Sequence, residues 1–210
     1  MDGIDFDWEQ PLNVNDFKMY YALIRLTFQV FQREGLLVSV ALHKGMYMPS
    51  KMYEFVDRIN LMTYDIDMMS GGYHADYDKV TGEIKSFISS NAPPEKLMMG
   101  IPMYARGSKK FAMTKTMEEL VEDANNNASF IVHRSSIGDL QWDNPQKIDA
   151  KVKFAIEKGI AGVFFWELGQ DFMDDELGPG GILLTATAES AKKYSQARME
   201  KDGTAISDEL

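Results

Sequence analysis

The chain has 210 residues, 45% of them hydrophobic and 26% charged, which is an ordinary composition for a globular protein. Its net charge of −10 argues against nucleic acid or an anionic membrane surface as a partner. No apolar run approaches the roughly 18 residues of a membrane-spanning helix. Without cysteine there is no disulfide or thiolate chemistry, and the scattered His43, His74 and His133 lack metal-ligand spacing. We therefore predict no metal and no cofactor.

The first stretch of the chain alternates between apolar and acidic residues from position 4 to position 9. On a strand, this alternation places Asp5, Asp7 and Glu9 on one face, with neighbouring carboxylates roughly 6.6 Å apart. Three like charges on one face repel one another, so the face must be solvated, bind a metal or carry out acid–base chemistry. The residues alone leave two interpretations open: a solvated edge strand, or a catalytic cluster with Glu9 nearest the mouth.

Helix and strand patterns then alternate along the chain. A first helix is predicted over 16–33, with Asn15 or Asp16 as its cap and Gly35 at its end. Further helices are predicted at 51–57, 77–90, 117–125, 145–158 (between Asn144 and Gly159) and 187–200. Apolar runs predict strands at 36–42, 59–64, 97–104, 130–133 and 160–168.

Strands alternate with helices about five times, which is the pattern of parallel βα units. In a barrel of such units, the active site forms at the C-terminal ends of the strands. Chemically capable side chains stand at or near these predicted ends: the acidic cluster, Tyr64, Asp65, Tyr104, Arg106 and Trp166. This convergence favours an enzyme over a structural module.

The acidic stretch, written Asp2-x-x-Asp5-x-Asp7-x-Glu9, resembles the signature of glycoside hydrolase family 18, the chitinases and their relatives. Three later segments resemble motifs of that family, in the same order: Met62-Thr63-Tyr64-Asp65, Gly100-Ile101-Pro102-Met103-Tyr104-Ala105-Arg106 and Gly162-Val163-Phe164-Phe165-Trp166-Glu167. The resemblance covers residues 2 to about 195. It departs from the family at Ala105, which replaces the usual glycine, and at Gln10, where many members carry tyrosine.

The resemblance implies an α/β fold that is part of a TIM (β/α)8 barrel. Because the acidic signature belongs on the fourth strand, the chain would supply strands four to eight with their helices. Residues 1–198 would form this incomplete catalytic barrel, with a small insertion at about 107–138 after the seventh strand and a polar tail at 199–210. Strands one to three, roughly 100 residues, would be absent. The chain would be a fragment of a longer enzyme, or another chain would supply the rest.

The implied reaction is hydrolysis of β-1,4 bonds between N-acetylglucosamine units, with retention and with assistance from the substrate's acetamido group. Glu9 would be the general acid/base, and the neighbouring carboxylates would favour its protonated form. Asp7 would orient the acetamido group, Asp5 would share a proton with Asp7, and Tyr64 would donate to the acetamido carbonyl. These four residues are the predicted catalytic set.

The resemblance also implies a sugar-binding set that would hold chitin or an N-acetylglucosamine oligosaccharide. It comprises Asp2, Gln10, Met62, Thr63, Asp65, Tyr104, Arg106 and Trp166. Trp166 would form the floor of the subsite for the reacting sugar, since an indole stacks well on a pyranose. Taken alone, Tyr64 is better explained by ordinary packing, and Tyr104 and Trp166 are as compatible with packing as with sugar binding. Trp142 is compatible with a cleft wall, although a tryptophan in this position is more often a packing residue.

Three alternatives remain open from the sequence: a chitin-binding lectin without turnover, an inactive fragment, or an endo-N-acetylglucosaminidase acting on glycoproteins. The family implies an extracellular or secretory location. The ending Ser207-Asp208-Glu209-Leu210 is similar to the retention address of the endoplasmic reticulum. Acidic residues begin at position 2, so no signal peptide is predicted at the start of this sequence.

Overall fold

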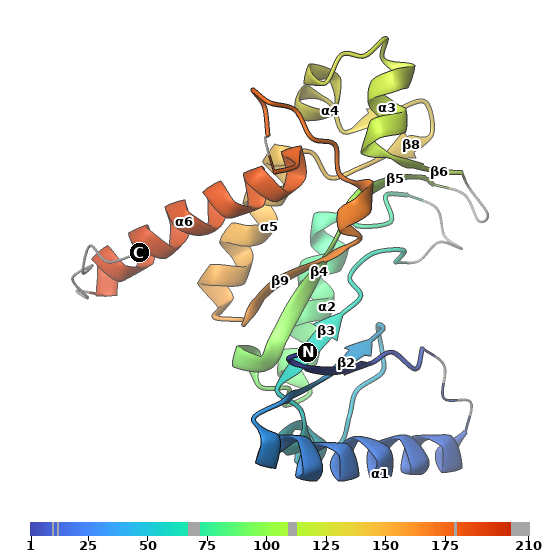
Figure 1. Ribbon diagram of the computed structural model, residues 1–210, viewed down its shortest axis with the longest axis vertical. Helices are drawn as coiled ribbons and strands as arrows, with labels where there is room; N and C mark the ends of the chain where they lie inside the picture. Colours follow the sequence, from blue (N-terminus) through green and yellow to red (C-terminus); the bar gives the residue numbers. More distant parts are fainter. Residues whose placement is uncertain (10, 12, 67–71, 109–112, 179, 203–210) are drawn as a thin grey trace.

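The computed structural model describes residues 1–9, 11, 13–66, 72–108, 113–178 and 180–202, without the side chains of 201 and 202. Its main sheet has five parallel strands in the order β1-β2-β3-β4-β9 (Figure 1). The strands are β1 (Gly3–Phe6), β2 (Leu37–Leu42), β3 (Arg58–Leu61), β4 (Leu97–Pro102) and β9 (Gly162–Trp166). Because all five run in one direction, the loops that follow them meet at one edge of the sheet. The predicted α/β organisation is confirmed.

Helices follow the strands and cover the sheet. The long ones are α1 (Val14–Phe31), α2 (Tyr77–Ser89), α5 (Pro145–Lys158) and α6 (Ile182–Asp202). Short 3-10 turns are η1 (Gln32–Glu34), η2 (Ser50–Phe55), η3 (Pro94–Lys96) and η4 (Leu168–Gln170). In Figure 1, α1 runs beneath β2, and α5 and α6 lie together beside β9. None of the helices described is long and apolar enough to cross a membrane.

Capping residues explain where these helices begin and end. Asn144 accepts a hydrogen bond from the Lys147 amide at the start of α5, and Gly159 ends that helix in the left-handed conformation, both as predicted. The cap predicted for α1 was wrong. Asn13, rather than Asn15 or Asp16, accepts from the backbone N–H groups of those two residues, so the helix begins two residues earlier.

A second, antiparallel sheet lies beyond β4, in the order β6-β5-β8-β7. Its strands are β5 (Tyr104–Gly107), β6 (Thr114–Thr116), β7 (Ser136–Ile137) and β8 (Leu140–Gln141), and it carries α3 (Met117–Asp123) and α4 (Ser129–His133). The strand predicted at 130–133 was therefore wrong: this short apolar run forms the helix α4, which buries the side chain of Ile131. The strand predicted at 97–104 is split between the two sheets.

Other predicted boundaries shift by a few residues. The strand predicted at 59–64 ends at Leu61, so Met62, Thr63, Tyr64 and Asp65 form the loop beyond β3. The short helix at 51–57 forms as the 3-10 turn η2, and the last helix begins at Ile182 instead of 187. The first of these shifts matters for function, because it places the predicted site residues outside the sheet and over its edge.

Two hydrophobic clusters form the core. One lies between β1–β4 and helices α1 and α2, and the other joins the end of β4 to the second sheet, α5 and α6. Trp142 belongs to the second cluster: its side chain is fully buried, and its Nε1 donates to the Ile131 carbonyl at 3.2 Å. Of the two interpretations of Trp142, core packing is confirmed.

One face of α1 is apolar and exposed. Met19, Leu23, Leu26 and Val30 recur at helical spacing and are 49–68% exposed. β1, above this helix, is an edge strand of the described sheet. Within the part of the chain that the structure describes, this flank thus has an unpaired strand edge and an apolar stripe that remains exposed.

Candidate active site

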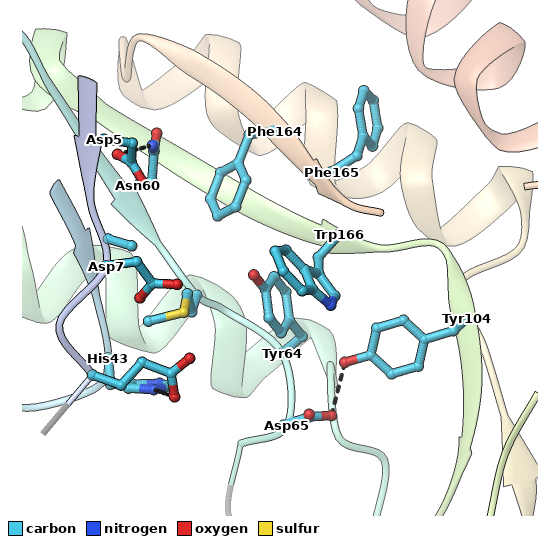
Figure 2. Close-up of a pocket in the computed structure, with 13 residues that line it drawn as sticks. Asp5, Asp7, His43, Asn60, Tyr64, Asp65, Tyr104, Phe164, Phe165 and Trp166 are labelled. Atoms are coloured by element: carbon cyan, nitrogen blue, oxygen red, sulfur yellow. Dashed lines mark hydrogen bonds and ion pairs between the residues drawn. The ribbon is translucent and has the colours of Figure 1, made fainter. Parts of the chain in front are cut away.

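A pocket of about 370 Å³ opens where the five parallel strands end. Figure 2 shows that side chains from β1, the loops after β2 and β3, and β9 point into it from different sides. The lining residues are Asp5, Asp7, Glu9, Ala41, His43, Asn60, Met62, Tyr64, Asp65, Tyr104, Phe164, Phe165 and Trp166. The structure therefore brings together eight of the predicted site residues: Asp5, Asp7, Glu9, Met62, Tyr64, Asp65, Tyr104 and Trp166.

The acidic row is held by the strands beside it. The Asp5 carboxylate accepts hydrogen bonds from the Ser39 hydroxyl on β2 and from Asn60 Nδ2 on β3, the latter at 3.0 Å. The parallel register places Asp5 beside Ser39, which explains the first contact. The end of β1 is also held from α1, because the Tyr20 hydroxyl donates to the Phe6 carbonyl at 3.1 Å. These contacts hold the end of β1 in place, and Asp7 and Glu9 follow directly from that fixed end.

The fold perturbs the protonation of Asp7. It remains exposed, but partial desolvation and the negative charges of Glu9 and Asp5 together raise its pKa. The positive influence of His43 acts in the opposite direction. Figure 2 shows Asp7 directed toward the ring of Tyr64 across the pocket. The raised pKa makes Asp7 the better placed of two neighbouring carboxyl groups to share a proton.

Glu9 lies at the rim, where its side chain is 55% exposed. Its Oε2 is 3.2 Å from Nε2 of His43, the residue that follows β2. His43 was not among the site residues predicted from the sequence, where it was considered only as a possible metal ligand. The signal that identifies it is its position: it comes directly after a parallel strand that neighbours β1.

Tyr64 crosses the floor of the pocket in a buried position. Its ring packs edge-on against Tyr104 and Phe164, with centroid distances of 6.5 and 6.2 Å. The packing depends on Gly100, where an added Cβ would approach a Tyr64 ring carbon to 2.7 Å and the Leu61 carbonyl to 2.8 Å. Burial raises the pKa of the Tyr64 hydroxyl, so this group remains a hydrogen-bond donor.

Asp65 is the centre of a hydrogen-bond network beside the pocket. It accepts from the Tyr104 hydroxyl at 2.9 Å and from Arg106 Nη1 at 2.7 Å, its backbone N–H donates to His74 Nδ1 at 3.3 Å, and the same Nδ1 lies 3.0 Å from the carboxylate. Burial opposes its ionisation, but the His74 and Tyr104 hydrogen bonds and the Arg106 charge outweigh it and lower the Asp65 pKa. Its φ of 54° is in the left-handed region, and the network holds the residue there.

Trp166 ends β9 with its indole 51% exposed at the pocket. Phe164 and Phe165 precede it and also line the cavity. Figure 2 places the indole opposite Asp7, with Tyr64 behind it. The pocket therefore has an acidic wall and an aromatic wall, which is the chemistry that binds the apolar face and the hydroxyls of a sugar.

Four predicted sugar-binding residues do not line the pocket or cannot be placed. Thr63 is a correction: it is fully buried, and its hydroxyl donates to the Gly100 carbonyl at 2.8 Å, which is a structural role. Asp2 is exposed and lies outside the lining. Arg106 contacts Asp65 instead of the cavity. Gln10 lies outside the described residues.

Among the residues described, no group of three His, Cys, Asp or Glu side chains is placed to hold a metal ion. The arrangement consists instead of carboxylates, a tyrosine hydroxyl and an exposed indole. Together, the fold and pocket define an α/β protein of the parallel-strand type with an acidic, aromatic-lined site at the C-terminal strand ends.

The family model "Glycosyl hydrolases family 18" matches residues 1–171, and the chain belongs to this family. It is 24% identical to a class V chitinase of Medicago truncatula, over 82% of this chain and 60% of that protein. It is 26% identical to an endochitinase of Brugia malayi, over 93% of this chain and 50% of that one. The chain thus spans about half to three fifths of these relatives.

Solved structures support the same fold. A GH18 chitinase, ChiB of Flavobacterium johnsoniae, matches with a TM-score of 0.74 at 20% identity, over 92% of this chain and 61% of that one. A GH18 chitinase of Cycas revoluta in complex with (GlcNAc)3 matches with a TM-score of 0.73 at 21% identity, over 90% and 68%. At this identity the likeness shows a TIM-barrel-like α/β fold.

Proposed function

We propose that the chain carries the catalytic face of a chitinase-type glycoside hydrolase, which cleaves β-1,4 bonds between N-acetylglucosamine units. The observation that carries this proposal is the placement of Asp5, Asp7 and Glu9 opposite Tyr64 and Trp166 in one pocket. The family membership and the chitinase names of its relatives support the same substrate class. Chitin or a chitooligosaccharide would be the ligand.

In this proposal Glu9 is the general acid and then the general base. Its exposed position at the rim suits a group that must meet a glycosidic oxygen and afterwards a water molecule. Glu9 protonates the leaving oxygen while the substrate's acetamido oxygen attacks the anomeric carbon. Water then opens the cyclic intermediate, and the two displacements together retain the configuration. No protein carboxylate needs to bond to the sugar.

The neighbouring groups stabilise the acetamido group during this step. Asp7 accepts a hydrogen bond from the acetamido N–H through one oxygen and shares a proton with Asp5 through the other. Asp5 is held as an acceptor by Ser39 and Asn60. Tyr64 donates to the acetamido carbonyl from the floor of the pocket.

The sugar itself lies on Trp166, whose exposed indole stacks on the apolar face of the pyranose. Tyr104 and Asp65 present polar atoms beside that surface and are themselves fixed by their mutual hydrogen bond. Met62 completes the lining next to Tyr64. This division places charge on one side of the sugar and apolar surface on the other.

We further propose that β1, β2, β3, β4 and β9 correspond to strands four to eight of an eight-strand barrel, within a catalytic unit of residues 1–198. The segment at about 107–138, much of it in the second sheet, would be the insertion after the seventh strand, and 199–210 would be a tail. The exposed edge of β1 and the apolar stripe of α1 support this assignment, because a preceding βα unit would cover both.

The test is release of a fluorophore from a chitobioside, by the unchanged chain and by Glu9→Gln. We expect the substitution to lower turnover by at least about 100-fold, because it removes the proton donor while keeping the size of the side chain. Glu157→Gln is the matched control, since Glu157 is exposed on α5 and is not among the residues that line the pocket. Binding of chitooligosaccharide without turnover in the unchanged chain would indicate a lectin. Neither binding nor turnover would indicate an inactive fragment.

A further inference from the structure

His43 occupies a fixed place beside the proposed acid. It follows β2 directly, and β1 and β2 pair in parallel as far as Phe6 and Val40, so the segments beyond them run on together. The His43 carbonyl accepts a hydrogen bond from the Met46 amide at 3.0 Å, which closes a tight turn. Gly45 lies in that turn at a φ of 84°, a conformation that suits glycine. The ring is thus presented from a rigid connection.

Among the residues that the structure describes, His43 is the one hydrogen-bond partner of the Glu9 carboxylate, with Nε2 and Oε2 3.2 Å apart. Both side chains line the pocket, and both are partly exposed, at 38% for His43 and 55% for Glu9. His43 also acts on the next carboxyl of the row, because its charge counteracts the rise in the Asp7 pKa. The ring therefore interacts with the two carboxyl groups that the proposed reaction uses.

The other titratable groups around this pair are on the remaining walls. Asp5 lies farther back on β1, and Tyr64 and Asp65 come from the loop after β3. Lys44 is next to His43 in the sequence. Asp65 is paired with Arg106, whereas Glu9, by direct contact, and Asp7, through its charge, are acidic groups on which His43 acts.

We propose that His43 is the positioning residue of Glu9 and shares its proton during catalysis. This inference rests on the proposed function, in which Glu9 is the acid/base. A lysine in this place would be a permanent cation and would hold Glu9 ionised, which would prevent it from acting as an acid. Histidine can give its proton up near neutral pH and take one back, so it can orient Glu9 without fixing its charge.

The proton that the pair gives up in the first step is replaced in the second. The Glu9–His43 pair begins with one proton in the Nε2···Oε2 hydrogen bond. That proton passes from Glu9 to the glycosidic oxygen as the bond from this oxygen to the anomeric carbon breaks. When water attacks the anomeric carbon, Glu9 accepts one of its protons, and the pair returns to its starting state. His43 forms no bond to the sugar in either step.

The hydrogen bond between Glu9 Oε2 and His43 Nε2 lets the shared proton rest on either group, so it stabilises the state in which the pair holds that proton. His43→Gln retains an N–H donor for Glu9 but cannot carry a proton. In the pH profile of kcat, we therefore expect the alkaline limb of the His43→Gln variant to lie at lower pH than that of the unchanged chain. Near neutral pH its kcat should be about tenfold lower, a smaller loss than that caused by removal of the acid itself. KM should change little. His43→Ala should lose more, and added imidazole should restore part of its rate.

His133→Gln is the control, since His133 is exposed on α4 and outside the pocket. A His43→Gln enzyme with the unchanged pH profile and kcat would overturn the inference, as would His43→Ala without response to imidazole. NMR of the His43 ring tests the pair independently of turnover. Its Nε2 resonance should respond to Glu9→Gln and not to Glu157→Gln. No response would overturn the inference, whereas a response in a chain without turnover would overturn only the proposed function.

Discussion

Asp65→Asn tests the network that holds the Tyr64–Asp65 loop under the pocket. One carboxylate oxygen accepts from the Tyr104 hydroxyl and the other from Arg106, and an amide, which has a single oxygen, cannot keep both contacts in this geometry. The Asn NH2 group would face either the Arg106 guanidinium or another donor, so at least one hydrogen bond is lost and the others lose their charge assistance.

The cost follows from exposure and geometry. A hydrogen bond to a charged group contributes about 1.5–3 kcal/mol, but the Asp65 side chain is 35% exposed, so water compensates part of the loss. We expect Asp65→Asn to lower the free energy of unfolding by about 2 kcal/mol, which for a chain of this size lowers Tm by about 4–8 °C. Urea denaturation at pH 7 measures the first quantity.

The effect should depend on pH in one direction. The folded state lowers the Asp65 pKa below its ordinary value of 3.8, so the stabilisation is complete above that value and is lost as the pH falls through the folded pKa. The difference in stability between the two proteins should therefore be largest at neutral pH and shrink under acid. Asp123→Asn, which removes a surface pair with Lys115, should have a small effect. An equal loss at pH 7 and at pH 3, or no loss, would refute the reasoning.

Two further substitutions test other parts of the molecule. Trp166→Ala should raise KM for chitooligosaccharide about tenfold, which corresponds to about 1.4 kcal/mol of stacking. Tm should remain nearly unchanged, because the indole is half exposed. A fall in Tm with an unchanged KM would contradict this prediction. Lys151 and Asp143 form a buried ion pair at 2.5 Å, and the Asp143 carboxylate also accepts a hydrogen bond from the Tyr73 hydroxyl. Removing either charge alone should cost about 3–5 kcal/mol in urea denaturation, whereas Lys151→Met with Asp143→Leu should cost less than the sum.

Local patterns predicted most of the elements of the main fold. The residues of α2 and α5 carry their own start and stop signals, and β2 is a continuous apolar run, so each was placed to within a residue or two. The failure at 130–133 has a local cause as well. A run of a few apolar residues fits a strand or a buried helical turn equally, and only the packing of Ile131 decides between them.

The candidate site was predicted by motif, and the structure brings most of those residues into one pocket. What the sequence did not reveal are the pairings between distant segments. Glu9 and His43 are 34 positions apart, and Asp65 and Arg106 are 41. Such contacts are set by strand register and loop shape. Thr63 failed for the opposite reason: it stands inside the motif, but its side chain turns toward the Gly100 carbonyl.

The acidic row gives one strand three carboxyl groups in three different environments. Asp5 is bound by two donors, Asp7 has a raised pKa, and Glu9 meets a histidine at the rim. All three are still exposed, because β1 is an edge strand of the described sheet. A strand paired with the free edge of β1 would exclude water from this face and raise the Asp7 pKa further, since desolvation is already its largest cause. We therefore expect that a chain extended by the preceding βα units turns over chitooligosaccharide faster than this one, with the same dependence on Glu9.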